Sequence, residues 1–230
     1  TPRYVEQEAH TELAHTLEIQ SAHEKDAAAR SGIHALRADL LAQKLHRPDD
    51  ALDAYISALE ATPASADVLA DLDAFATLMD KWPATIDAVD GLLARVHQNE
   101  GILSLALWLG SALQSSPESY GRAIVAFEQA RAVAPDSPLA LTALDALYRA
   151  TGRYDDLKVL LNAQMVTAEP EQRAEMTLDL AELLRAEEGA RAALPLLKDL
   201  IWEAPEDSRA EALLDELARD EDAGAEAIAI

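Results

Sequence analysis

One short pattern of residues ends three segments of helical periodicity, and its spacing limits the folds that are open to this chain. The pattern sets a small residue, a large residue, a second small residue and a proline at fixed positions. Its copies end at Pro63, Pro135 and Pro205, which are 72 and 70 residues apart. A fixed period predicts stacked, similar units rather than one globular core, and such arrays usually bind other molecules rather than catalyse reactions.

The residues around these prolines show that neighbouring units differ. The two complete copies share small and large residues at the same positions: Ala51, Tyr55 and Ala58 in one, and Ala123, Phe127 and Ala130 in the other. Between them lies a second kind of unit, in which a shift of 72 residues places Leu72-Asp73-Ala74 and Trp82 on Leu144-Asp145-Ala146 and Tyr154. The repeat is therefore a pair of unequal helical hairpins.

Helical periodicity extends along nearly the whole chain and is interrupted only at short segments with proline, glycine or polar residues. No segment alternates with the period of two residues that is typical of a strand. Helices joined by two to six residues are usually antiparallel neighbours. The sequence thus predicts an all-α chain with helices at 3–22, 25–45, 49–61, 66–79, 83–97, 101–114, 118–133, 138–150, 154–167, 171–186, 190–203 and 207–219.

Half of the repeat is about 36 residues, close to the 34 residues of a tetratricopeptide repeat. The segment 138–171 resembles that family best, with Leu141, Leu144 and Tyr148 on its first helix and Gly152 and Tyr154 at its turn. In the corresponding repeat at 66–97, Asp80 takes the place of the turn glycine. The resemblance implies a right-handed α-solenoid of stacked antiparallel helix pairs.

We expect this array to occupy residues 1–230 as a single domain. It would consist of a leading helix at 3–22, helix pairs at 25–63, 66–97, 101–135, 138–167 and 171–205, an end-cap helix at 207–219 and a tail at 220–230.

The formal net charge of -23 restricts the class of partner. Nucleic acids and anionic membranes reward clustered Lys and Arg, so we expect neither nucleic-acid binding nor membrane insertion. The acidic residues are spread along every helix, which favours solubility, but an acidic surface also suits a partner with a basic segment. We expect a soluble chain, in the cytoplasm or, for a processed fragment, in the periplasm, and the preference for Arg over Lys suggests a bacterial source.

Searches for chemical motifs give negative predictions. The segment Glu12-Leu-Ala-His15 matches half of a di-iron carboxylate motif, but no second copy exists. His23-Glu24 begins like a zinc motif, yet Ala27 stands where the second histidine should be. The chain has no cysteine, no phosphate-binding glycine loop and no nucleophile elbow. We therefore predict no metal site, no cofactor and no catalytic residue, although an enzyme built from scattered acids stays formally open.

The uncharged helix around Trp108 is the strongest candidate for binding. Its polar residues Ser104 and Ser111 fall on one face, joined by Ser115 and flanked by Leu107 and Trp108. In the tetratricopeptide family this face of each first helix lines the concave groove, which extends the candidate set to other units. The predicted partner-binding residues are Ser104, Leu107, Trp108, Ser111, Gln114, Thr142, Arg149, Leu178, Glu182 and Arg185.

Two interpretations of Trp108 stay open. A helix between neighbours in an array is apolar on most sides, so Trp108 fits a packing role. Alternatively, Trp108 and Leu107 line a shallow slot for an apolar segment of a partner. We expect Trp82 and Trp202 to pack against neighbouring helices. The sequence predicts a non-catalytic scaffold that binds a partner protein through a basic or apolar segment, with self-association through the repeat ends as the alternative.

Overall fold

In the computed structural model, which describes residues 2–205 and 207–230, the chain is built of α-helices and contains no strand within those residues. The elements are α1 (Pro2–His23), α2 (Ala27–Gln43), α3 (Pro48–Ala61), α4 (Ala66–Leu78), α5 (Trp82–Leu93), α6 (Asn99–Leu113), η1 (Pro117–Ser119), α7 (Tyr120–Val133), α8 (Pro138–Thr151), α9 (Tyr154–Met165), α10 (Pro170–Glu188), α11 (Ala190–Glu203), α12 (Ser208–Leu217) and α13 (Gly224–Ala227). The prediction of an all-α fold of antiparallel helix pairs is confirmed.

The helix boundaries differ from the prediction in a few places. Helix α5 ends at Leu93 instead of residue 97, because the chain turns there with hydrogen bonds from Arg95 and Val96 back to the Leu92 carbonyl. The single-turn helix η1 was not predicted. The predicted tail at 220–230 contains α13, whose Ala227 is 2% exposed and belongs to the same apolar cluster as residues of α11 and α12.

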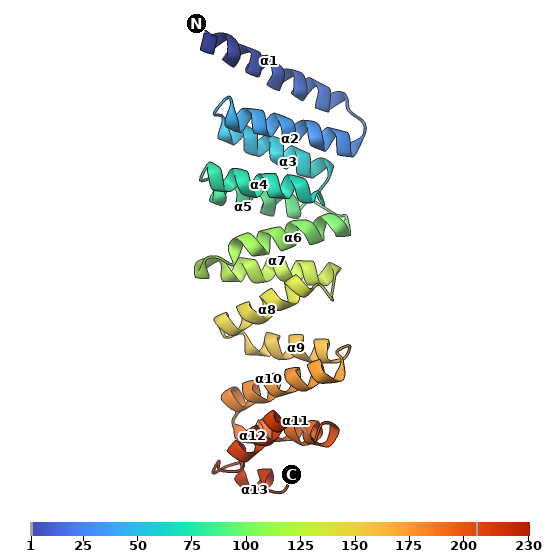
Figure 1. The fold of residues 1–230 in the computed structure, drawn as a ribbon, viewed down its shortest axis with the longest axis vertical. Coiled ribbons are helices and arrows are strands. Elements are labelled where there is room, and N and C mark those ends of the chain that lie inside the picture. The colour runs from blue at the N-terminus through green and yellow to red at the C-terminus, as the bar shows by residue number, and fades with distance from the viewer. Residues whose placement is uncertain (1, 206) are drawn as a thin grey trace. The chain divides into compact units, whose positions relative to one another are not determined.

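The chain divides into two compact units, Thr1–Leu147 and Tyr148–Ile230, with the boundary inside α8. Within the first unit, helices α1 to α7 follow one another in chain order, and within the second the same holds for α9 to α13 (Figure 1). A single array over 1–230 and the handedness of a superhelix stay predictions, because each unit is described by itself.

The helix pairs are of two kinds, in agreement with the alternation of unequal hairpins in the sequence. The backbones of α2 and α3, of α6 and α7, and of α10 and α11 approach closely over much of their length, whereas α4 and α5 do so at few positions. The close pairs carry fully buried alanines, such as Ala58 and Ala130, both 0% exposed. Alanine permits a short distance between helix axes, so these residues make the close pairs possible.

The turns that follow α4 and α8 share a backbone geometry. The predicted turn residues Asp80 and Gly152 both have a left-handed backbone, with φ of 53° and 68°. After each of them the next residue donates a 2.9 Å hydrogen bond back to the first helix, from Lys81 to the Ala76 carbonyl and from Arg153 to the Tyr148 carbonyl. Aspartate adopts this conformation more readily than most residues, so it can replace glycine here.

Candidate functional site

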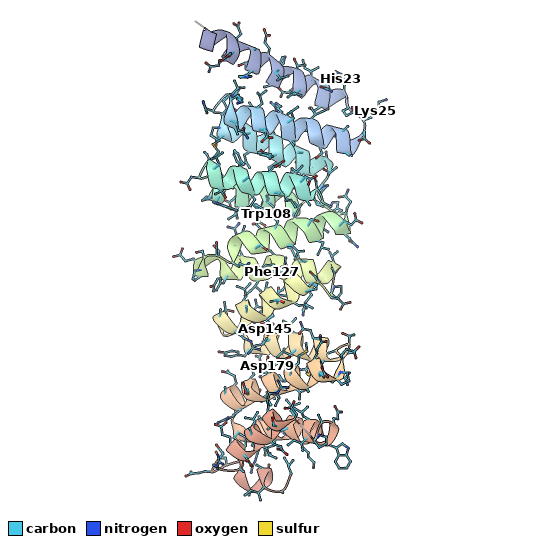
Figure 2. The ribbon with its side chains drawn as sticks, in the orientation of Figure 1. His23, Lys25, Trp108, Phe127, Asp145 and Asp179 are labelled. Atoms are coloured by element: carbon cyan, nitrogen blue, oxygen red, sulfur yellow. The ribbon has the colours of Figure 1, made fainter. Side chains whose placement is uncertain are left out.

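Two tryptophans from different helices form the most distinctive surface feature of the first unit. The rings of Trp82 and Trp108 lie with their centroids 6.1 Å apart and their planes 18° from parallel. Trp82 is the first residue of α5, where Pro83 occupies the first turn, a position that suits proline. Trp108 lies on α6, which contains the uncharged segment 102–113 singled out in the sequence (Figure 2). Both side chains are partly exposed.

The stacked rings line an open pocket of about 350 Å³ between three helices. Helix α4 supplies Asp73, α5 supplies Trp82 and Ile86, and α6 supplies Trp108, Ser111 and Ala112, while Ser115 lies in the turn that follows α6. This volume lies at the lower end of the usual range for ligand pockets. We call this surface the tryptophan pocket. It lies where α4 and α5 approach closely at few positions, which leaves room for two indole rings.

The tryptophan pocket carries a negative charge and hydroxyl groups at an otherwise apolar surface. Asp73 and Ser115 are exposed, and Ser111 is partly exposed. The Ser115 hydroxyl donates a 3.0 Å hydrogen bond to the Ala112 carbonyl, so its oxygen retains its capacity to accept. No lysine, arginine or histidine lies among the residues that line this pocket.

The indole nitrogen of Trp108 is buried and has no hydrogen-bond partner among the described residues. A buried donor without an acceptor costs about 1–3 kcal/mol. A phenylalanine in place of Trp108 would therefore lose no hydrogen bond to another described residue. This makes Trp108→Phe a mild substitution with which to test the ring's role.

The structure brings only part of the predicted binding residues together. Trp108 and Ser111 line the tryptophan pocket with Ser115, while Ser104 and Leu107 on the same helix, and Gln114 directly after its end, lie outside it. Thr142 is exposed on α8 and does not line this pocket.

The other four predicted residues belong to the second unit, where three of them already have structural contacts. Leu178 is 8% exposed and belongs to an apolar cluster with residues of α11 and α12, which gives it a packing role. The Arg149 guanidinium pairs with Asp179 at 3.2 Å, and Arg185 pairs with Glu216 at 2.8 Å. Glu216 raises the pKa of Arg185 through this hydrogen bond. Glu182 is exposed on α10.

Sequence reasoning missed four of the residues that line the tryptophan pocket, namely Asp73, Trp82, Ile86 and Ala112. We expected Trp82 to pack at a turn, yet it forms one wall of the pocket with its ring partly exposed. Asp73 was noted only as a residue that recurs between units. For Asp73 and Trp82, the available signal was their position along the chain. Asp73 lies on α4 and Trp82 begins α5, the helix directly before α6, which carries Trp108.

The expectation that Trp202 packs against its neighbours is wrong. Trp202 lies in the last turn of α11 and is 89% exposed. The buried residues of α11 are Ala193, Leu194, Leu197 and Leu200. Helical geometry places residue 202 outside the stripe that these residues define, so its ring faces solvent.

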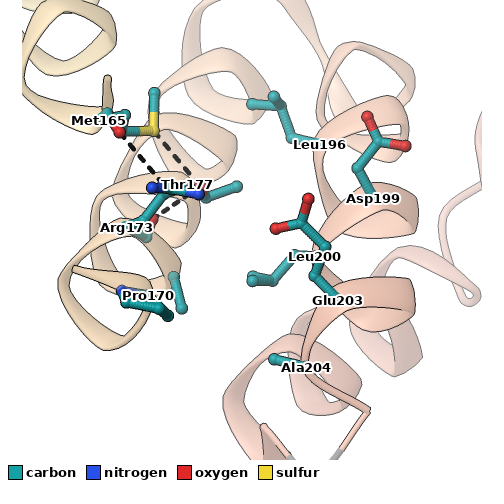
Figure 3. Close-up of a pocket in the computed structure, with 10 residues that line it drawn as sticks. Met165, Pro170, Arg173, Thr177, Leu196, Asp199, Leu200, Glu203 and Ala204 are labelled. Carbon is teal, nitrogen blue, oxygen red and sulfur yellow. Dashed lines mark hydrogen bonds between the residues drawn. The ribbon is translucent and has the colours of Figure 1, made fainter. Parts of the chain in front are cut away.

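A second hollow of about 220 Å³ lies within the second unit, between α10 and α11 (Figure 3). Its α11 wall carries the carboxylates of Asp199 and Glu203 with Leu196 and Leu200. On the opposite wall, the Arg173 guanidinium donates hydrogen bonds to the carbonyls of Met165 and Ala168, at 3.1 and 2.9 Å. The only basic group of the hollow is thus already engaged in holding the α9–α10 connection.

The described residues include no cluster of three or more His, Asp or Glu side chains that could hold a metal ion. Among the helices searched over the same residues, none is both long and apolar enough to cross a membrane.

Comparison with solved structures finds tetratricopeptide repeat proteins. YrrB, described as a TPR protein with an unusual peptide-binding site, is 18% identical over 86% of this chain and 97% of its own, with a TM-score of 0.44. The protein TTC0263 of Thermus thermophilus is 20% identical over 87% of this chain and 100% of its own, with a TM-score of 0.33. A tetratricopeptide repeat protein of Parabacteroides merdae is 14% identical over 98% of this chain and 93% of its own, with a TM-score of 0.35.

The chain is therefore similar to tetratricopeptide repeat proteins, as the residues of its hairpins predicted. No family model and no curated protein matches the sequence. The likeness to solved structures concerns the fold and assigns no partner.

Proposed function

We propose that this array of helix pairs is a non-catalytic scaffold that binds a segment of a partner protein, and that the tryptophan pocket is the centre of the binding surface. The observation that carries the proposal is the pair of partly exposed, stacked indole rings in an open pocket. Tryptophan is enriched among the residues that dominate binding energy, and it tends to lie in a central pocket ringed by weaker contacts. Ser104 and Leu107 on the same helix, with Gln114 directly after its end, are suited to be such surrounding contacts.

The charge of the chain favours a partner segment that is basic as well as apolar. The chain has 42 acidic residues and only 19 Lys and Arg, so carboxylates would remain in excess even if every basic residue were paired. Several of the bases link neighbouring helices, as Lys81 does with Asp49 and Arg122 with Asp87 and Asp90. The surplus negative charge attracts a basic segment at long range and speeds association.

A selection from a random peptide library displayed on phage tests this function. We expect immobilised chain to enrich peptides, and Trp108→Ala to weaken their binding at least tenfold, because truncating a central aromatic residue usually costs about 2 kcal/mol or more. Leu107→Glu should weaken binding as well, by placing a charge on the apolar face. The matched controls are Trp202→Ala, the same change at the exposed tryptophan, and Val125→Glu on α7, where Val125 is 52% exposed. Both controls should bind like the wild type.

Stability decides how a loss of binding is interpreted. Circular dichroism and thermal melting of each variant come first, since a large drop in melting temperature for Trp108→Ala would give the ring a core role. In that case Trp108→Phe, which loses no hydrogen bond, replaces it in the binding assay. The proposal is wrong if no peptide is enriched, or if Trp108→Phe and Leu107→Glu, both folded, bind like the wild type. Light scattering across concentrations addresses the alternative of self-association, which predicts a mass that rises with concentration.

A further inference from the structure

We propose that the tryptophan pocket anchors one arginine side chain of the partner segment, with the guanidinium stacked on an indole face and paired with Asp73. This inference rests on the proposed function and names the chemistry that the pocket recognises. It is carried by three observations: the geometry of the two rings, the single carboxylate beside them and the excess negative charge of the chain.

The ring geometry fixes where a ligand group can lie. A planar group held between two parallel rings needs about 7 Å between their planes, which is twice the contact distance of about 3.5 Å between atoms. The centroids of Trp82 and Trp108 are only 6.1 Å apart, so no third group fits between the rings. A ligand must therefore lie on an outward face of the pair. That face is electron-rich and attracts a cation, most strongly when the ring is tryptophan.

The polar groups of the pocket match a guanidinium. Asp73 offers a carboxylate that can accept two parallel N–H bonds, and the Ser115 oxygen can accept another. A guanidinium has five N–H donors and no acceptor, so it can use several of these groups at once. The absence of any basic residue from the pocket lining leaves no competing cation within it. An acidic ligand would meet Asp73 and be repelled.

The same features favour arginine over lysine and over an apolar side chain. An ammonium is a compact, strongly hydrated charge, whereas the guanidinium is planar, more weakly hydrated and suited both to stacking and to two-point pairing with a carboxylate. An apolar side chain would cover Asp73 and leave its charge without a partner, which costs free energy. The net charge of -23 adds long-range attraction for a basic segment.

Nuclear magnetic resonance of the three indole N–H groups tests this assignment at a constant ionic strength. The probes are the blocked tripeptides acetyl-Ala-Arg-Ala-amide, its lysine analogue and its citrulline analogue, which keeps the shape of arginine without the charge. We expect the arginine peptide to shift the Trp82 and Trp108 signals with saturation at millimolar concentration, and to leave the Trp202 signal in place. The lysine peptide should bind at least threefold more weakly, and the citrulline peptide more weakly still. Single Trp→Phe variants assign the three signals.

A pair of charge-matched variants tests the carboxylate. Asp73→Asn should weaken the arginine peptide by about threefold to tenfold, the range for an exposed but well-oriented charged pair. Asp215→Asn is the control, because Asp215 lies two repeat periods, of 72 and 70 residues, after Asp73, and its loss removes the same charge from the other unit. It should bind like the wild type.

The outcomes separate this inference from the function on which it rests. Equal shifts with lysine or citrulline, shifts that survive Asp73→Asn, or signals of Trp82 and Trp108 that do not move would overturn the arginine assignment. In those cases, phage peptides that still need Trp108 but carry no arginine would leave the scaffold function standing. If no library peptide binds at all, the scaffold function itself fails, whatever the tripeptides do.

Discussion

Replacing Gly110 with alanine is expected to lower the free energy of unfolding by about 1–3 kcal/mol, the usual cost of overpacking a core. A Cβ atom at Gly110 would lie 2.8 Å from two atoms of the Phe127 ring. That ring is 0% exposed and belongs to the closely approaching pair α6 and α7, so it could move aside only by displacing neighbouring side chains. Urea unfolding followed by circular dichroism measures the change.

The clash also predicts strong non-additivity between the two positions. Phe127→Ala alone should cost about 3–5 kcal/mol through the cavity that it leaves. Adding Gly110→Ala to that variant should cost nothing further, because the ring that blocked the Cβ is gone and alanine is the better helix former. The coupling energy of the cycle should therefore be about as large as the cost of Gly110→Ala alone.

Gly91→Ala provides the matched control for this cycle. Gly91 lies inside α5, and a Cβ there would meet no atom within 4 Å. The substitution should stabilise the chain by about 0.5–1 kcal/mol through helix propensity. If Gly110→Ala behaved like Gly91→Ala, the close approach of α6 and α7 at this point would be wrong.

Tyr55 is expected to make the chain lose stability steeply above about pH 10. Its side chain is 2% exposed and its hydroxyl donates a 2.7 Å hydrogen bond to Asp39. Burial, and then the hydrogen bond and negative charge of Asp39, raise the pKa of Tyr55 well above its ordinary value, and the charge of Asp71 adds to this. The folded chain therefore keeps the tyrosine proton at a pH where the unfolded chain releases it.

The sign and size of the effect follow from this difference in bound protons. Above the ordinary tyrosine pKa of about 10, the unfolded state binds one proton fewer, so stability falls by about 1.4 kcal/mol for each further pH unit. Below about pH 10 both states hold the proton and this contribution to stability is fully present. Urea unfolding at several pH values between 8 and 12 measures the slope.

Tyr55→Phe tests the assignment at both ends of this range. Near pH 8 the variant should be less stable by about 1.5–3 kcal/mol, because it removes a hydrogen bond to a charged group. Above pH 10 its stability should fall less steeply than that of the wild type, so the two curves should approach each other. Parallel curves would mean that Tyr55 ionises in the folded chain as it does when unfolded.

The sequence predicted local features well because local chemistry decides them. Prolines and polar clusters end a helix whatever its surroundings in the fold. The recurrent residues Ala51, Tyr55 and Ala58 are all buried in a closely packed helix pair. Asp80, which stands where the repeat pattern has glycine, also adopts the left-handed backbone of the turn. The helix α13 was missed because four residues carry too little periodicity to predict a helix.

The candidate site could be predicted only in part. Trp108 and Ser111 were found because they share a face of one helix, which the spacing along the chain determines. The contact between Trp82 and Trp108 depends on how far α4, α5 and α6 separate, and spacing within one helix carries no information on that distance. Trp202 is a different case, because the spacing along α11 by itself places residue 202 on the face opposite the buried stripe, so its exposure could have been predicted from the sequence.

The sequence by itself predicted a repeat of two unequal helical hairpins, because small residues and prolines recur at fixed positions in one kind of hairpin and an aromatic turn residue recurs in the other. Only the tertiary structure decided which residues stay accessible where α4 and α5 approach closely at few positions. Packing three helices around two indole rings, rather than around alanines, placed a stacked pair and one carboxylate at the surface. That arrangement arises between helices, where the volumes of side chains from distant positions must fit together.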